Sequence, residues 1–407
     1  PHKQRTLGVK TAMKHDFETV VSRRNCGSIK WEQMLKNNPN AAADVAPLSV
    51  ADMELKNPPE IIEGLKDYLD THILGYTAPT EAYYDAVCGW MKHRHGWDVK
   101  PEEIILTSGV VPALFTAVLA YTEPGDGVIT MPPVYGPFGF SIKQNGRVNV
   151  ECPLLNDNEY YTIDFDRFEA LCAEPKNKMF ILCSPHNPAG RVWSRAELSK
   201  IGEICARHSV LVVSDEIHFD LIMPGNQHTV FPLACENGCP DYIVCTAPSK
   251  TFNLATLQTS NIIIPDETLR KKFQAVLDMV DANAATALGM EACRLGYTRC
   301  EGWLDEAIDL IWRNFQFCSR FIAENCPGIT CSRLEGTYLM WINCESLGLD
   351  DDALHQLLFK HDLYCNDGRF FSAGGERHIR INLAGPAKML EAAMQRFKAA
   401  CAEVLPQ

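Results

Sequence analysis

The sequence predicts an α/β protein, with a mostly parallel central sheet covered by helices on both faces and a smaller α+β domain after it. Two observations support this prediction. Strand-like and helix-like segments alternate from about residue 60 to residue 295, and the pattern changes after Pro327-Gly328 to short, mixed elements. A TIM barrel is the alternative architecture, but the long helical run after Ile264 argues against it.

The first half of the chain supplies most of the expected sheet. A helix is expected to begin at Pro58-Pro59, because proline is favoured in the first turn of a helix. A second helix is expected to run from a Thr80 cap to about His95. Strands are then expected at Ile104–Leu106, Gly127–Met131, Arg147–Val150, Lys178–Cys183 and Val210–Ser214, and helices from Pro112, near Asp164–Ala173 and from Ser194 to about His208.

The second half completes the sheet and forms the smaller domain. Strands are expected at Tyr242–Cys245, Thr259–Ile264, Thr337–Asn343 and His378–Leu383, and helices at Thr268–Val280, Ala284–Leu295, Trp303–Asn325, Asp350–His361 and Ala387–Val404. We therefore expect three regions. Residues 1–58 form an N-terminal arm and part of the small domain, 59–296 the large domain and 297–407 the C-terminal small domain. The arm shows no clear periodicity around Arg23-Arg24 and is expected to pack on another surface, such as a partner subunit.

Composition excludes several classes of partner. The chain has 407 residues, of which 46% are hydrophobic and 22% charged, as in globular proteins. Its net charge of -13 argues against binding to nucleic acid or to an anionic membrane. No apolar run approaches the roughly 18 residues of a membrane span, and no secretory signal is recognised at the start. We expect a cytoplasmic protein.

The 17 cysteines do not form a recognisable framework. Their number is odd, no C-x-x-C occurs, and Cys235-x-x-x-Cys239 lacks a second pair at zinc-finger spacing. We expect reduced cysteines that act as small buried hydrophobic residues, and no metal site.

Lys250 is the main candidate for chemistry. It follows the strand-like run Tyr242–Cys245 and precedes a polar turn, and ligands in α/β proteins bind at such strand ends. Partial burial there lowers the pKa of an amine and makes it a nucleophile. Considered alone, Lys250 is more often an ordinary surface lysine.

Two earlier strand ends change that assessment. One carries Asn187-Pro188 and the next carries Asp215, which lie 63 and 35 residues before Lys250. An Asn-Pro turn, an Asp and a Ser-Lys at successive strand ends resemble the fold-type I pyridoxal 5′-phosphate (PLP) enzymes, the aspartate aminotransferase superfamily. The resemblance implies the fold-type I PLP-dependent transferase fold, with residues 59–296 as the PLP-binding domain.

The resemblance implies a role for each matching residue. Lys250 matches the lysine that forms a Schiff base with the cofactor, Asp215 the carboxylate beside the pyridine nitrogen, and Asn187 the residue that hydrogen-bonds the phenolic oxygen. His218 stands three residues after Asp215, where aminotransferases usually carry a tyrosine. Tyr135, which lies between prolines, matches the aromatic residue that stacks on the cofactor ring.

Further matches concern the phosphate, the substrate and the partner subunit. Gly109, Val110 and Val111 match the phosphate-binding turn at a helix N-terminus, with Ser249 as a further donor. Tyr76 matches a catalytic tyrosine that reaches the neighbouring subunit's phosphate, which implies a homodimer with active sites at the subunit interface. Arg380 matches the arginine that binds the substrate carboxylate through two hydrogen bonds.

Within the superfamily, the motifs are most similar to the MalY/PatB-type cystathionine β-lyases, or C–S lyases. The similar stretches include Val50-Ala51-Asp52-Met53 and Ser214-Asp215-Glu216-Ile217-His218. The resemblance implies α,β-elimination of L-cystathionine or a related cysteine S-conjugate to a thiol, pyruvate and ammonia, with Asp52 and Met53 near the distal part of the substrate. An aminotransferase and a regulatory PLP-binding protein without turnover are the alternatives.

Two positions depart from the aminotransferase pattern. Gln258 stands eight residues after Lys250, where many aminotransferases have a phosphate-binding arginine, and this difference favours the lyase. Thr256 stands where the family usually has a glycine, so the loop is expected to differ locally.

Overall fold

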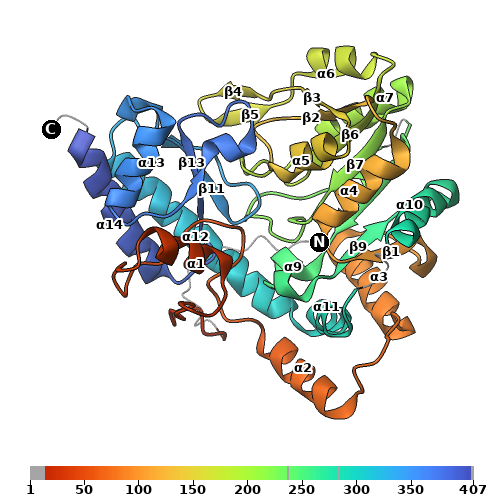
Figure 1. The fold of residues 1–407 in the computed structure, drawn as a ribbon, viewed down its shortest axis with the longest axis horizontal. Coiled ribbons are helices and arrows are strands. Elements are labelled where there is room, and N and C mark those ends of the chain that lie inside the picture. Colours follow the sequence, from red (N-terminus) through yellow and green to blue (C-terminus); the bar gives the residue numbers. More distant parts are fainter. Residues whose placement is uncertain (1–13, 236–237, 282–284, 405–407) are drawn as a thin grey trace.

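A seven-stranded sheet forms the centre of the computed structural model, which describes residues 14–235, 238–281 and 285–404 (Figure 1). Its strand order is β1-β9-β8-β7-β6-β2-β3, as expected for an α/β fold. All neighbouring strands pair in parallel except β9, which is antiparallel to β1 and β8. The strands are β1 (Ile104–Thr107), β2 (Gly127–Thr130), β3 (Val148–Glu151), β6 (Asn177–Cys183), β7 (Leu211–Asp215), β8 (Tyr242–Thr246) and β9 (Ser260–Ile263).

Helices cover both faces of this sheet because its central strands are apolar on both sides. In β6, Met179 and Ile181 pack among residues of α4, α5 and α10, whereas Phe180 and Leu182 pack among residues of α6, α7 and α8. These helices are α4 (Val110–Tyr121), α5 (Pro137–Gln144), α6 (Phe165–Cys172), α7 (Arg195–His208), α8 (Phe231–Ala234) and α10 (Glu267–Met279). Three further helices contribute to a second cluster beside β1: α2 (Pro59–Thr71), α3 (Glu81–His95) and α11 (Ala287–Arg299).

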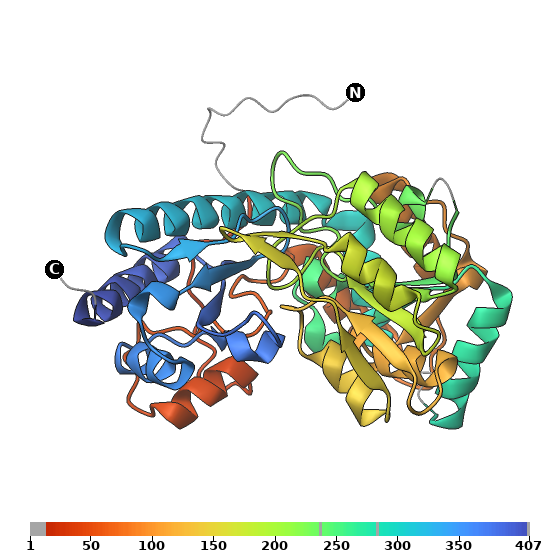
Figure 2. The same cartoon turned by 90° about the horizontal axis from the view of Figure 1, so that it is seen from above.

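A second, antiparallel sheet of four strands forms the other half of the molecule, in the order β10-β11-β13-β12. Figure 2 shows the 25-residue α12 (Glu301–Asn325) running along one side of the molecule from the first half to the second. The remaining elements here are β10 (Thr330–Cys331), β11 (Leu339–Asn343), α13 (Asp351–Lys360), β12 (Asn366–Asp367), β13 (His378–Asn382) and α14 (Ala387–Val404).

Most of the expected elements are confirmed, including the side-chain cap at Thr80 and the capping box of Ser194 with Glu197. Elements that had no expected counterpart include α5, α8, the short helix after β8, β10, β12 and the short hairpin of β4 (Leu155–Asp157) and β5 (Tyr160–Thr162). Thr256 lies in a 3-10 turn, Ala255–Leu257, and it is Gln258 that adopts a positive φ of 49°. The expected helix start at Ala284 lies outside the described residues.

The N-terminal arm is more regular than its sequence indicated. Residues Ile29–Asn37 form helix α1, whose Trp31 and Met34 pack against Tyr364 of the small-sheet half. The described part of the arm therefore has a packing surface within its own chain. Its first 13 residues lie outside the described part, and the division at residues 58 and 296 stays a prediction. Among the described helices, none has the length and apolar character needed to span a bilayer.

Candidate active site

A cavity of about 180 Å³ lies where the carboxyl ends of β6, β7 and β8 meet the N-terminus of α4. This is the edge at which open α/β sheets bind ligands. The cavity brings together nearly all the residues singled out in the sequence. Its lining includes Gly109, Val110, Val111, Tyr135, Asn187, Asp215, His218, Ser249 and Lys250.

Lys250 lies on the cavity wall, in the short helix α9 (Pro248–Thr251) that follows β8. Its amine Nζ donates a hydrogen bond to the Ala51 carbonyl oxygen at 2.6 Å. Desolvation by the surrounding protein, with a further contribution from the positive charge of Arg380, lowers the pKa of Lys250 to about 8. About a tenth of this amine is therefore uncharged at pH 7, far more than in an ordinary lysine, and the uncharged form is the nucleophile.

Asp215 ends β7 and is only 5% exposed. Burial raises the pKa of Asp215 to about 7, although the Ile217 N–H donates a hydrogen bond to its carboxylate at 3.1 Å. Its one hydrogen bond among the described residues comes from a backbone N–H, so the carboxylate can pair with a positively charged group of a ligand.

Arg380 provides a positive charge next to the cavity, from β13 of the second sheet, and contacts Asn187 of the lining. It is 3% exposed, and its guanidinium donates only to amide oxygens, those of Asn187 at 2.9 Å and Asn366 at 2.7 Å. Its Nε has no hydrogen-bond partner among the described residues, and burial lowers the pKa of Arg380 to about 10. A buried guanidinium with unused donors suits a carboxylate ligand.

The N-terminus of α4 forms another part of the cavity wall. Gly109 precedes the helix and has no side chain to cap it, so the first N–H groups have no capping partner there. These groups and the helix dipole favour an anion such as a phosphate. Ser249 lines the same cavity and its hydroxyl could contribute a further donor.

The rings of His218 and Tyr135 form part of the cavity lining. His218 is 3% exposed, its Nδ1 has no hydrogen-bond partner among the described residues, and burial holds its pKa well below the usual value. The neutral imidazole can therefore donate to, or accept from, a polar group of a ligand. The half-buried Tyr135 packs edge-on against Phe138 and Phe370.

Four predicted residues do not line the cavity: Arg380, which contacts it through Asn187, and Tyr76, Asp52 and Met53. Tyr76 is fully exposed on the segment that joins α2 to α3, where Ile73 and Leu74 are also exposed. Figure 1 shows α2 projecting away from the rest of the chain. Asp52 and Met53 line a separate cavity of about 710 Å³ together with Arg23 and residues near the start of α2.

The residues of the small cavity fit PLP. A buried carboxylate for the ring nitrogen, an uncapped helix N-terminus for the phosphate and an amine for the aldehyde all line the same cavity. Lys250, Asp215, Asn187 and the turn at Gly109 would hold the cofactor, and Arg380 would bind the substrate carboxylate.

The structure also reveals contacts that sequence reasoning missed. Ala51 lines the cavity and its carbonyl oxygen accepts from Lys250 and, at 2.8 Å, from the Tyr338 hydroxyl. Asn366 accepts from both Arg380 and the Val50 N–H. Backbone contacts of this kind leave no residue-type signal in a sequence.

Comparisons with known proteins agree with this geometry. The model of the family Aminotransferase class I and II matches residues 43–397. The chain is 41% identical over 386 residues to cystathionine beta-lyase PatB of Bacillus subtilis, covering 95% of this chain and 99% of that protein.

Solved structures give the same result. Cystalysin from Treponema denticola, whose structure contains a PLP cofactor, matches with a TM-score of 0.94 and 46% identity, covering 97% of this chain and all of that one. The PLP-bound C–S lyase from Staphylococcus hominis matches with a TM-score of 0.89 and 29% identity, covering 96% and 99% of the two chains.

Proposed function

Because this chain belongs to the class I and II aminotransferase family, we propose that it is a PLP-dependent C–S β-lyase. Its substrate class is L-cystathionine or a related cysteine S-conjugate, which reacts with water to give a thiol, pyruvate and ammonia. The observation that carries the proposal is that Lys250 and Asp215 line one cavity and that Arg380 hydrogen-bonds Asn187 of the same lining. Within the family, the sequence similarity to cystathionine beta-lyase PatB and the structural similarity to a C–S lyase favour this reaction.

Each residue has a distinct part in this reaction. Arg380 binds the substrate carboxylate and thereby fixes the direction of the bonds at the α-carbon. Lys250, with its pKa of about 8, accepts the α-proton as general base. When bound, the cofactor supplies an electron sink, which the negative charge of Asp215 maintains. The C–S bond at the β-carbon then breaks and the thiolate departs.

The aminotransferase alternative is weaker. It would use the same base and the same carboxylate site, and would differ in where the proton returns. Similarity to cystathionine beta-lyase PatB and to the C–S lyase from Staphylococcus hominis supports the lyase, and Gln258 lines the cavity where many aminotransferases have an arginine.

Three further features belong to the proposal. The protein is cytoplasmic. It forms a homodimer in which Tyr76 reaches the phosphate bound by the partner subunit. The exposed apolar residues Ile73 and Leu74 near Tyr76 support this assembly. The 710 Å³ cavity beside Asp52 and Met53 holds the distal part of the substrate, since it has both cationic and anionic side chains, as a distal amino-acid group requires.

The test is a pyruvate assay with L-cystathionine on the PLP-loaded protein. We expect pyruvate and a thiol in equal amounts, and a loss of about a thousandfold or more in Lys250→Ala, because a general base contributes about 10²–10⁴ in rate. Amino transfer to a keto acid without pyruvate release would instead establish the aminotransferase, and PLP binding without either reaction would establish a binding protein.

A further inference from the structure

The Ala51 carbonyl oxygen holds the Lys250 amine in the structure. It belongs to the segment Val50–Glu54, which we call the strap. The strap approaches Lys250 from a part of the chain about 200 residues away, and the Tyr338 hydroxyl donates to the same oxygen. The position of this oxygen therefore determines where the Lys250 amine lies, in its uncharged as in its protonated form.

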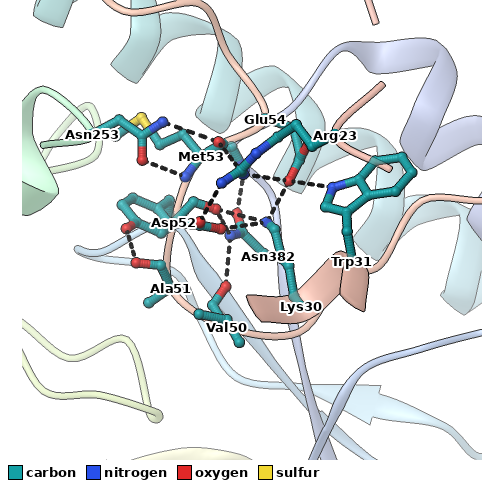
Figure 3. A network of polar contacts seen from close by, with 12 residues as sticks. Arg23, Lys30, Trp31, Val50, Ala51, Asp52, Met53, Glu54, Asn253 and Asn382 are labelled. Atoms are coloured by element: carbon teal, nitrogen blue, oxygen red, sulfur yellow. Dashed lines mark hydrogen bonds and ion pairs between the residues drawn. The ribbon is translucent and has the colours of Figure 1, made fainter. Parts of the chain in front are cut away.

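A buried ionic network holds the strap in place (Figure 3). Lys30 is 1% exposed, and its Nζ lies 2.9 Å from the Asp52 carbonyl oxygen, 2.7 Å from the Asp52 carboxylate and 2.8 Å from the Glu54 carboxylate. Arg23 forms ion pairs with the same two carboxylates at 2.9 Å. The network thus contains two cations and two anions.

Hydrogen bonds tie the strap to both halves of the molecule. Asn253, three residues after Lys250, receives from the Met53 N–H at 2.9 Å and donates to the Met53 carbonyl at 3.0 Å. Asn382, two residues after Arg380, donates to the carbonyls of Val50 and Asp52 at 2.9 and 2.6 Å. Figure 3 shows these side chains converging on the strap from different segments.

The strap carries backbone strain. Val50 has a φ of 58°, a conformation that a β-branched residue rarely adopts. Such strain persists only where the surroundings hold it. Here the Val50 N–H donates to Asn366, which also binds Arg380. Buried ion pairs contribute little net stability, so the network and the strain together point to a need for one particular strap geometry.

We propose that Lys30 and Asp52 are positioning residues for Lys250, because their buried network fixes the Ala51 carbonyl oxygen as the resting place of the Lys250 amine whenever that amine is free. This inference rests on the proposed function, in which the free Lys250 amine accepts the α-proton. Lys30 touches neither the cavity nor the expected substrate, and acts through the strap.

The charges of the network also affect the pKa of Lys250, and they do so in opposite directions. The negative charge of Asp52 raises the pKa of Lys250, and the positive charge of Lys30 lowers it. Removing Lys30 should therefore raise the pKa of Lys250, and removing the Asp52 charge should lower it. The other titratable groups near Lys250 include Arg380, Asp215, His218 and Tyr338, whose hydroxyl donates to the same Ala51 oxygen.

The test measures PLP capture by the full-length chain freed of cofactor, followed by absorbance from pH 6 to pH 9.5. The rate of PLP capture depends on the fraction of uncharged Lys250 and needs no substrate. The result of this experiment is therefore separate from that of the lyase assay. The variants are Lys30→Met, Lys30→Arg and Asp52→Asn. Lys271→Met serves as the control, because it removes a lysine from an exposed ion pair with Glu267.

We expect the midpoint of the pH profile to move upward by about half a unit or more in Lys30→Met and downward in Asp52→Asn. Lys30→Arg should restore the wild-type midpoint, Lys271→Met should not move it, and kcat should fall about tenfold in Lys30→Met. Unchanged midpoints, or shifts of both variants in one direction, would overturn the proposal. If Lys30→Met does not fold, Asp52→Asn decides alone, because asparagine keeps the size of the side chain and removes only its charge.

Discussion

Arg380 is the residue whose surroundings most directly indicate a ligand. Its buried guanidinium has no carboxylate partner among the described residues, so Arg380→Lys keeps the charge but loses the paired donors. We expect kcat/KM for L-cystathionine to fall about 10- to 100-fold, mostly through KM, since each charge-assisted hydrogen bond contributes about 1.5–3 kcal/mol. Steady-state pyruvate kinetics measure this.

The control for that prediction is Arg369→Lys. Arg369 is exposed and pairs with Asp367 and Asp352, none of which lines the cavity. The Arg369→Lys variant should therefore have the kcat and KM of wild type. An unchanged KM in Arg380→Lys would show that the carboxylate binds elsewhere.

Asp215 gives a prediction about stability and pH. An aspartate in the unfolded chain ionises near pH 4, whereas folded Asp215 keeps its proton to about pH 7. Between these values the folded state binds the extra proton, so this group makes stability fall as pH rises from about 4 to about 7. Asp215→Asn removes the effect, because an amide does not ionise.

We therefore expect cofactor-free Asp215→Asn to unfold at a higher temperature than wild type at pH 7.5, by a few °C, with a smaller difference at pH 5. Thermal unfolding at both pH values measures it. Asp157→Asn, at an exposed position in β4, should follow the wild-type profile. A variant less stable than wild type at pH 7.5 would contradict the buried-charge explanation.

Helix α4 is the element whose N-terminus determines phosphate binding. A Cβ at Gly109 would meet no atom closer than Pro112 at 3.4 Å, so a side chain is tolerated there. Aspartate is a favourable N-cap, but its carboxylate would take the place of the phosphate. We expect Gly109→Asp to fold and to bind PLP about 100-fold more weakly, as measured by equilibrium titration.

Gly109→Ala tests the same element without adding a charge. Its PLP affinity should remain within about threefold of wild type, because the helix N–H groups stay available. Equal weakening by alanine and aspartate would mean that backbone geometry, not charge, limits binding.

The whole molecule is expected to be a dimer, and Tyr76 provides the test. If each site combines Lys250 of one subunit with Tyr76 of the other, a mixture of Lys250→Ala and Tyr76→Ala chains contains mixed dimers with one intact site. Random pairing makes half of the dimers mixed, so about a quarter of wild-type activity should return.

Pyruvate release after joint refolding of the two variants measures this recovery, and each variant refolded alone is the control. No recovery despite mixed dimers would mean that Tyr76 acts within its own chain or not at all. We expect recovery, because Tyr76 is fully exposed and therefore free to contact a second subunit.

The sequence by itself determined the central sheet and most of the site. Strands such as β6 and β7 are continuous apolar runs, and their polar ends meet at one edge because parallel strands share a direction. The sequence therefore predicts that Lys250, Asp215 and Asn187 lie together, and all three line the cavity.

Only the tertiary structure decided the direction of β9, the helix in the N-terminal arm and the strap at Lys250. Strand direction depends on the connection, and α1 is stabilised by packing on a distant segment. The strap acts through the Ala51 backbone, which any residue type can provide. Such contacts depend on where distant segments meet, and the order of residues does not reveal them.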